Sequence, residues 1–380
     1  MNRACRIALL SLIAAGLLAG QVAAGEKGAE RTRTASHTLG PKQAVFLENL
    51  LGAIEVVGGK GNTLGLEARV FAEGESEADA EALAETVKLE TEEGADGLHV
   101  RVAFPVEHHA SYRLPDAAKS ARWYMDLLHG VGEFFTKDKE LSAEYGGQTV
   151  RMGKGKEAVA LAVRLRVTLP QGRAATVRQA FGEIRLASLR SNATVRCERA
   201  RVLTEQLYGN LAVEACLAPV TVHSFQGSKL EVRGVPSRIE LVNVRAGSID
   251  LKAGTGRVEG QGVQADKFSV EAAEGDIALE DFAAVDFDIA ATLGDVKLAP
   301  DLSRTKQGKL RTQSGEIRLK LGGFLPFALT ARSDSGSVSG SGPAVVVDAD
   351  GKHAASVRRG RGGATLEAAC TSCDIAVVSR

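Results

Sequence analysis

The pentapeptide GDIAL at residues 275–279 is the clearest copy of a short pattern that recurs along much of this chain. In the pattern, apolar residues stand two and four positions after a glycine, and another stands five positions before it. It returns as GDVKL at residues 294–298 and as GEIRL at residues 315–319, after spacings of 19 and 21 residues. Repeats of this length are typical of solenoids, in which each unit buries its apolar face on the next.

The repeat has a simple physical interpretation. Alternation places Ile277 and Leu279 on one face of a strand and Asp276 on the other. Glycine at the corner of each unit tolerates backbone angles that other residues resist. About ten rungs, each roughly 4.8 Å thick, would build a rod on the order of 50 Å long. The position three residues before the corner holds small residues, namely Ala253, Ala272, Ala291, Thr312 and Ser333.

We therefore predict an all-β chain, a right-handed β-solenoid or β-helix-like stack of repeats with a small helix-containing N-terminal part. Residues 1–24 have a basic start, a short apolar run and small residues at the end, which predicts a secretory signal peptide. Residues 25–43 lack periodicity and are predicted to be a flexible lead. Residues 44–105 are predicted to form strands and a short helix, residues 106–157 an irregular or helical insertion, and residues 158–380 the solenoid.

The predicted helix of the N-terminal part begins after Ser76 and runs to about Thr86. Ser76 can cap it, and Asp79 stands where the acid of a capping box belongs. The solenoid begins with strict alternation over residues 159–169, which is a strong strand signal. Stacked rungs leave unpaired edges at both ends. We expect the helix-containing part to cap one end and the cysteine-bearing C-terminal end to cap the other.

The insertion holds the single tryptophan and many of the scarce aromatic residues. Residues 116–135 show apolar residues at partly helical spacing. One interpretation is a helical plug packed on the sheet. The alternative is an exposed patch for a partner or a membrane surface, with these candidate residues: Trp123, Tyr124, Leu127, Phe134 and Phe135.

Bulk composition excludes some classes of function. The 47 basic residues equal the 47 acidic ones, so the chain lacks the overall basic charge that nucleic-acid binding favours. Beyond the predicted signal peptide, no segment is apolar enough to span a membrane. Aromatic residues are only 4% of the chain, which argues against a face that stacks sugars.

Four cysteines remain once the predicted signal peptide is removed: Cys197, Cys216, Cys370 and Cys373. Cys197 and Cys216 lie one repeat apart, so in a solenoid they would stack at a distance that a disulfide accepts. The alternative is two buried free thiols. Cys370 and Cys373 form a Cys-x-x-Cys motif, which we interpret as a structural disulfide closing the last turn; a redox pair or half a zinc site are the alternatives.

Other candidate sites are weak. Adjacent His108 and His109 would point to opposite faces of a strand, so they are not expected to bind one ion. Residues 348–351 resemble the start of a calcium loop but lack its later ligands, and a turn is the better interpretation. The repeated acids Glu183, Asp276, Asp295 and Glu316 would repel along one face, and we expect Lys and Arg such as Lys297 and Arg318 to lie between them. No catalytic residue, metal site or cofactor is predicted.

The order of these features resembles a known family. GAIEV at residues 52–56, AVRLRVTLP at residues 162–170 and the later glycine units are similar to the bacterial putative adhesin family of β-strand repeats, which is largely a domain of unknown function. The resemblance covers residues 44–380. It implies a β-repeat fold and an adhesin-like role, and it brings no catalytic residues.

Together these observations favour an exported, non-enzymatic β-repeat protein of the cell envelope, located in the periplasm, at the cell surface or outside the cell. Its expected partner is a protein or glycan. Two alternatives remain open. One is a polysaccharide-active β-helix enzyme, which the scarcity of aromatics disfavours. The other is an envelope accessory or sensor module that docks through residues 116–137.

Overall fold

A computed structural model describes residues 28–115, 141–153, 157–322, 325–341 and 353–379 of this chain. It contains one described helix, α1 (Glu77–Thr86), and the following strands: β1 (Gly28–Thr38), β2 (Ala44–Gly59), β3 (Thr63–Glu73), β4 (Lys88–Glu93), β5 (Gly97–Ala103), β6 (Ser111–Arg113), β7 (Leu141–Tyr145), β8 (Gln148–Met152), β9 (Val159–Pro170), β10 (Ala175–Ala187), β11 (Ala193–Tyr208), β12 (Leu211–Cys216), β13 (Val220–Val235), β14 (Arg238–Ala253), β15 (Arg257–Glu274), β16 (Ile277–Leu293), β17 (Val296–Pro300), β18 (Gln307–Leu321), β19 (Phe327–Ser333), β20 (Val338–Ser341), β21 (Ala354–Arg359) and β22 (Ala364–Ser379).

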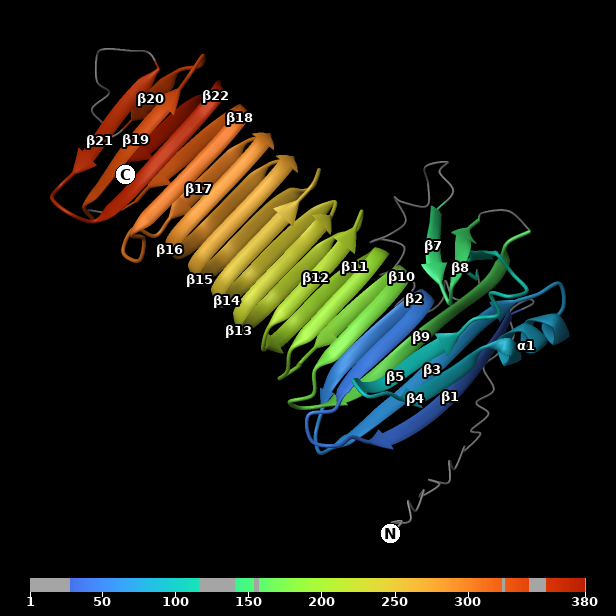
Figure 1. Cartoon of the computed structure of the whole chain (residues 1–380). Coiled ribbons are helices and arrows are strands. Elements are labelled where there is room, and N and C mark those ends of the chain that lie inside the picture. Colours follow the sequence, from blue (N-terminus) through green and yellow to red (C-terminus); the bar gives the residue numbers. More distant parts are fainter. Residues whose placement is uncertain (1–27, 116–140, 154–156, 323–324, 342–352, 380) are drawn as a thin grey trace, which may run out of the picture.

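The strands belong to one continuous sheet that coils into a rod, with β1 and α1 at one end and β19 to β21 at the other (Figure 1). From β10 to β18 each strand pairs in parallel with the next rung of the coil. Parallel pairing in register is what a repeat of nearly constant length produces. The predicted β-solenoid is therefore confirmed, and the rungs follow the repeat in the sequence.

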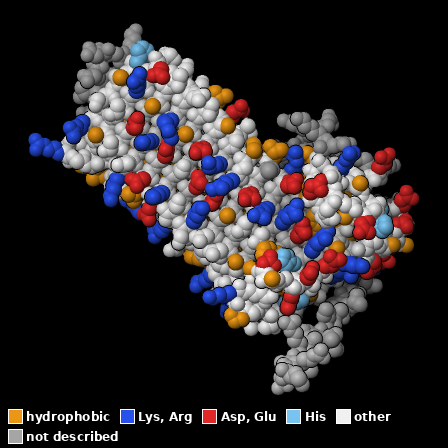
Figure 2. All heavy atoms as spheres, viewed as in Figure 1, with side chains coloured by type: hydrophobic (Ala, Val, Ile, Leu, Met, Phe, Trp, Pro, Cys, Tyr) orange, Lys and Arg blue, Asp and Glu red, His pale blue; other side chains and the backbone are white. Residues whose placement is uncertain are grey.

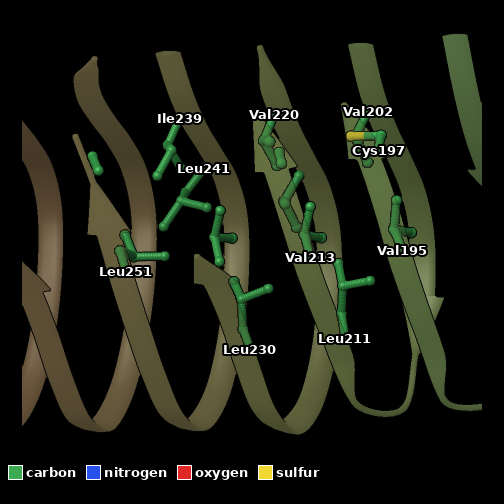
Figure 3. Close-up of a cluster of buried hydrophobic side chains, with 14 of the residues drawn as sticks. Val195, Cys197, Val202, Leu211, Val213, Val220, Leu230, Ile239, Leu241 and Leu251 are labelled. Carbon is green, nitrogen blue, oxygen red and sulfur yellow. The ribbon is translucent and has the colours of Figure 1, made fainter. Parts of the chain in front are cut away.

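The core consists of apolar columns that run along the axis of the rod. Val258, Ile277, Val296 and Ile317 pair in register on successive rungs and are fully buried. Figure 3 shows how side chains of neighbouring rungs, such as Leu211 of β12 and Leu230 of β13, lie side by side inside the coil. A single rung could not bury this surface, because each side chain is covered by the equivalent residue of the next rung.

One corner of the coil is a column of glycines. Gly275, Gly294 and Gly315 are in register, with φ angles of 120°, 140° and 126°. A Cβ atom on Gly294 would lie 2.3 Å from the carbonyl oxygen of Gly275 on the preceding rung. The corner therefore requires glycine both for its backbone angle and for the close approach of neighbouring rungs.

A second corner was not predicted from the sequence. It is a column of left-handed residues, one per rung, which lie just after β10 or within the longer strands that follow it. Its members are Ser188 (φ 53°), Gln206 (57°), Ser224 (54°), Asn243 (54°), Gly262 (66°) and Asp281 (47°). Asn and Asp tolerate this conformation better than most residues. The column escapes a search for glycines because only one member is a glycine.

Both ends of the rod place remote segments side by side. At the N-terminal end, β2 lies between β9 and β10 and pairs in parallel with both. At the C-terminal end, β22 lies between β18 and β19, again parallel to both. The expectation that the cysteine-bearing C-terminal end caps the rod is therefore wrong: β22 is an internal rung, and the antiparallel β19–β21 pair forms the end.

The N-terminal part differs from prediction in two ways. The lead predicted to be flexible over residues 25–43 contains β1, which pairs antiparallel with β3 along its whole length. Its half-buried positions include Arg31 and Arg33, which form ion pairs with Glu81 and Glu85 of α1, so apolar alternation could not reveal the strand. The second difference is that β2, assigned to a separate unit over residues 44–105, is a rung of the solenoid.

The capped helix agrees with prediction. Ser76 is the N-cap of α1 and forms a reciprocal capping box with Asp79. In the insertion at residues 106–157, the described part contains three short strands, β6, β7 and β8. The predicted helical segment 116–135 and the signal peptide at residues 1–24 lie outside the described residues. Among those that are described, no helix combines the length and the apolar character needed to cross a membrane.

Candidate functional site

A long recess of the described surface follows one flank of the rod, and we call it the flank groove. It comprises two hollows that meet at Gly234. The hollow of about 750 Å³ runs from Gly234 to Thr371. The other, of about 330 Å³, runs from Gly234 back to Asn49 and is bordered by Tyr145 of β7. Together they span most rungs of the solenoid.

The floor of the flank groove is the row of positions three residues before the glycine corner. Its members stack in register from Asn49 and Gln179 through Ala272 and Ala291 to Cys370. These side chains are short or turned inward, so the flank is hollow here. The row is the same set of small residues that the sequence repeat indicated, extended toward the N-terminal end of the rod and with Cys370 inserted between Thr312 and Ser333.

Polar members of this row form hydrogen bonds with backbone carbonyl groups at the corner beside them. Gln179 donates through Nε2 to the carbonyl oxygen of Phe181 at 2.7 Å. Thr312 donates through Oγ1 to that of Ser314 at 3.1 Å, and Ser333 donates through Oγ to that of Cys373 at 2.7 Å. Each bond ties a floor side chain to a backbone carbonyl at or next to the bend. The floor is therefore rigid.

The wall of the flank groove is a row of charged residues that stack in register one residue before the floor row. Arg178 forms an ion pair with Glu48 at 3.2 Å, Arg196 with Glu214 at 3.2 Å, and Lys252 with Glu271 at 3.1 Å. These pairs are solvent-exposed and each contributes about 0–1 kcal/mol. Because they are so weak, a bound partner could replace one member at little cost.

Arg311 continues the wall toward the C-terminus and forms an ion pair with Asp288, which lies two residues before the wall position of its own strand. One guanidinium nitrogen of Arg311 donates to both carboxylate oxygens of Asp288, at 2.7 and 2.8 Å. Between Glu271 and Arg311 the row holds Ala290, which is half-buried, so the wall is lowest at this rung. The centre of the larger hollow therefore offers both charges and a small apolar surface.

A third hollow, of about 650 Å³, adjoins the N-terminal end of the groove and shares Arg178 and Arg196 with it. Glu48 accepts from Arg178 there and lies 3.9 Å from Arg101. The Arg101 guanidinium lies over the ring of Tyr145, 5.1 Å from its centre. Burial raises the pKa of the Tyr145 hydroxyl, which donates to the carbonyl oxygen of Val102 and stays protonated at neutral pH.

The repeated acids of the glycine corner accept hydrogen bonds from the backbone of the next rung. Asp276 accepts a hydrogen bond from the backbone N–H of Asp295 at 3.1 Å, and Asp295 accepts one from that of Glu316 at 3.0 Å. Lys297 and Arg318 were expected to interleave from neighbouring rungs, but each pairs with the acid two residues earlier on its own rung, Lys297 with Asp295 and Arg318 with Glu316. Within the described residues, no group of three or more His, Cys, Asp or Glu side chains is placed to hold a metal ion.

The cysteines stand on the floor row or next to it. Cys370 is on the floor row, Cys373 takes the place of the corner glycine, and the two form a disulfide. Cys197 is buried on the floor row, and its thiol lies 3.3 Å from the carbonyl oxygen of Ala200. The register pairs Cys197 with Ala215 rather than with Cys216, whose side chain is outside the described part, so that disulfide stays a prediction.

The remaining candidates are the aromatic patch, the calcium-like turn and the pair of adjacent histidines. The predicted partner patch (Trp123, Tyr124, Leu127, Phe134 and Phe135) and the calcium-like residues 348–351 lie outside the described residues. His109 packs edge-on against Tyr112, with ring centres 6.5 Å apart. Sequence reasoning found the floor of the groove as a row of small residues but missed its charged wall, because ion pairs between rungs need the exact register.

The sequence matches the Toastrack DUF4097 family over residues 162–378, which is more than half of the chain. The chain belongs to this family. The matched region begins in β9 and ends in β22, so the Toastrack segment is the solenoid without the rung of β2, together with most of the flank groove. The resemblance to a β-repeat family of unknown function is thereby confirmed.

Solved structures with weak similarity to this Toastrack chain were also found. A putative lipid binding protein from Parabacteroides distasonis is 11% identical, covers 92% of this chain and 96% of its own length, and has a TM-score of 0.39. A putative adhesin from the same species is 10% identical, with coverages of 92% and 97% and a TM-score of 0.38. Similarities at this level transfer neither a role nor a site. No curated protein matches the chain.

Proposed function

We propose that this protein is a non-enzymatic binding module of the bacterial cell envelope, which holds an extended segment of a protein or glycan in its flank groove. The observation that carries the proposal is the continuity of the groove. Two hollows join over a rigid floor of short side chains, and the floor repeats at the spacing of the rungs. A compact ligand would use one hollow, whereas a chain-like partner could use the whole length.

The chemistry of the wall supports a partner that both donates and accepts hydrogen bonds. Arg196, Lys252 and Arg311 supply donors, and Glu214, Glu271 and Asp288 supply acceptors. Peptide backbones and sugar hydroxyls carry both kinds of group, so either could exchange with the exposed pairs. The groove has no single charge sign that would select a polyanion or a polycation.

The proposal is tested by closing the groove at its lowest point. Ala290→Trp would fill the larger hollow. Ala278→Trp is the matched control, because Ala278 is on the same strand β16 and is equally half-buried, but does not border the groove. We expect both variants to fold, and Ala290→Trp alone to lose retention of envelope peptides or glycans. Equal retention by both variants would refute a binding role for the groove.

Export is part of the proposal and needs its own test. The predicted signal peptide, fused to an enzyme that is active only outside the cytoplasm, should confer activity, and a fusion lacking residues 1–24 should not. Activity without those residues would contradict export by this route. Release of sugar fragments from envelope polysaccharides by the purified protein would instead favour the alternative of a β-helix enzyme.

A further inference from the structure

The balanced net charge conceals a strong separation of charge along the rod. Residues 28–115 hold 8 basic and 15 acidic side chains, a net charge of −7. Residues 159–300 hold 17 of each and are neutral, and residues 301–380 hold 12 basic and 7 acidic, a net charge of +5. Because the coil is built almost in chain order, this gradient in sequence is also a gradient in space (Figure 2).

The acidic end is formed around α1. Glu75, Glu77 and Asp79 are exposed there, at the start of the helix and in the turn that leads into it. Glu92 and Glu93 are exposed on β4 in the same part of the molecule. Arg31 and Arg33 of β1 neutralise only the far turn of the helix, through Glu81 and Glu85.

The basic end is formed by the last rungs and their turns. Arg358 and Arg361 are exposed on β21 and in the turn that follows it. Lys306 and Lys309 are exposed on the rung of β18. None of these four side chains appears in an ion pair within the described part of the chain. Their charges therefore remain available to a partner.

Each end of the rod is also an edge of the sheet. Among the described residues, β1 pairs only with β3 and β21 pairs only with β19. The outer sides of these two strands leave backbone N–H and C=O groups without strand partners, and such edges can pair with another chain. Charge and hydrogen-bonding capacity therefore coincide at the same two places.

We propose that copies of this protein associate head to tail, with the basic β19–β21 end of one rod against the acidic α1 end of the next. A second copy is the occupant because each molecule carries both complementary surfaces, 7 negative charges at one end and 5 positive at the other. Such a contact uses two different surfaces, so it leaves one free surface at each end and extends into chains of rods. This inference concerns the ends of the rod and does not depend on what the flank groove binds.

Sedimentation velocity of the full chain tests the proposal at low and high salt. The contact should be strong at about 20 mM salt, where charges interact over tens of ångströms, and weak at 1 M, where screening limits them to about 3 Å. We expect the concentration for half-association to rise at least about tenfold between these conditions. A protein that is monomeric at low salt, or whose association ignores salt, would overturn the proposal.

Charge-reversal variants identify the surfaces. Arg358→Glu with Arg361→Glu should abolish association, and so should Glu75→Lys with Glu77→Lys. Mixing these two double variants should restore it, because the glutamates placed on the basic end of one variant match the lysines placed on the acidic end of the other, and the unchanged ends still match. The control is Arg245→Glu with Lys267→Glu in the neutral middle, which should associate like the wild type.

Failure of the mixture to associate would overturn the pairing of the two ends, and loss of association in the control would show that overall charge matters instead. Circular dichroism of each variant checks that the fold is intact. Sedimentation with vesicles containing anionic lipid provides the remaining test. Monomeric protein that binds these vesicles through Arg358 and Arg361 would assign the basic end to a membrane surface and refute self-association.

Discussion

Substituting alanine for Gly294 tests the stacking geometry most severely at a single site. The added Cβ would lie 2.3 Å from the carbonyl oxygen and 2.7 Å from the carbonyl carbon of Gly275, at a backbone φ of 140°. The unfavourable φ costs about 1–3 kcal/mol, and forcing an atom into a packed site costs about 1–3 kcal/mol more. We therefore expect the free energy of unfolding of the affected rungs to fall by about 2–6 kcal/mol.

The chain offers a clean control for this substitution. Gly322 has no positive φ, and nothing lies within 4 Å of the Cβ that alanine would add. Gly322→Ala should change stability by less than about 0.5 kcal/mol. Because long repeat arrays do not unfold as one unit, hydrogen exchange of individual amides assigns a loss to particular rungs, whereas a denaturation midpoint reports it only for the unit that unfolds together. Amides of Gly275, Ile277 and Gly294, which bond across this corner, should lose protection in Gly294→Ala.

The reasoning would be refuted if Gly294→Ala and Gly322→Ala exchanged at the same rates throughout β16 and β18. Such a result would mean that the rungs can separate at the corner without cost. The close approach of Gly275 and Gly294 would then have no role in fixing the register of the coil.

Three further predictions follow from the corners and their acids. Asp295→Ala should lower stability by about 1–3 kcal/mol, because the backbone N–H of Glu316 loses its charged acceptor, while Asp295→Asn keeps an acceptor and should lose less; chemical denaturation of both variants checks this, and equal losses would contradict it. Reduction of the Cys370–Cys373 disulfide should cost about 2 kcal/mol, since the bond closes a short loop, and an unchanged denaturation midpoint with and without a reductant would disprove that contribution. The hydrogen bond from Lys229, with the nearby charge of Arg233, lowers the pKa of the Glu231 carboxyl below its usual 4.5, so this carboxylate stabilises the fold above that pH and loses its contribution as the pH falls; the difference in midpoint between wild type and Glu231→Gln should shrink on acidification, and a difference that grows would have the wrong sign.

The repeat in the sequence predicted the solenoid because its two determinants are local. Glycine at the corner and alternation after it are visible in any single copy, and Gly275, Gly294 and Gly315 do occupy one column. The capping box of Ser76 and Asp79 is equally local and was correctly predicted. Signals confined to a few consecutive residues can be interpreted without knowing which other segments pack against them.

What sequence reasoning could not supply depends on segments that are far apart in the chain. The strand β22 pairs with β18 and β19, but several rungs have similar apolar faces, and the sequence does not indicate which of them would be its neighbours. Arg31 and Arg33 occupy half-buried positions of β1 and form ion pairs with α1, so no alternation of apolar residues indicates this strand. The wall of the flank groove exists only because residues 19 or so apart in sequence stack in register, as Lys252 and Glu271 do.

The separation of charge is a second feature that becomes visible only when the spatial order of the segments is known. A count over the whole chain returns zero and seems to exclude electrostatic partners. Division by position along the rod gives −7, 0 and +5 instead. The division is meaningful only once the structure shows that chain order and spatial order nearly coincide.

A photocrosslinking scan in living cells tests the proposed binding function most directly. A photoreactive residue would replace, one at a time, the groove positions Lys252, Glu271, Ala290 and Arg311, which stack in register. The control row is Glu240, Glu259, Ala278 and Lys297, which stack in the same way on the same rungs but outside the groove. We expect one partner to crosslink at several groove positions and at none of the control positions; crosslinks confined to the control row, or evenly shared between the rows, would contradict a binding groove on this flank.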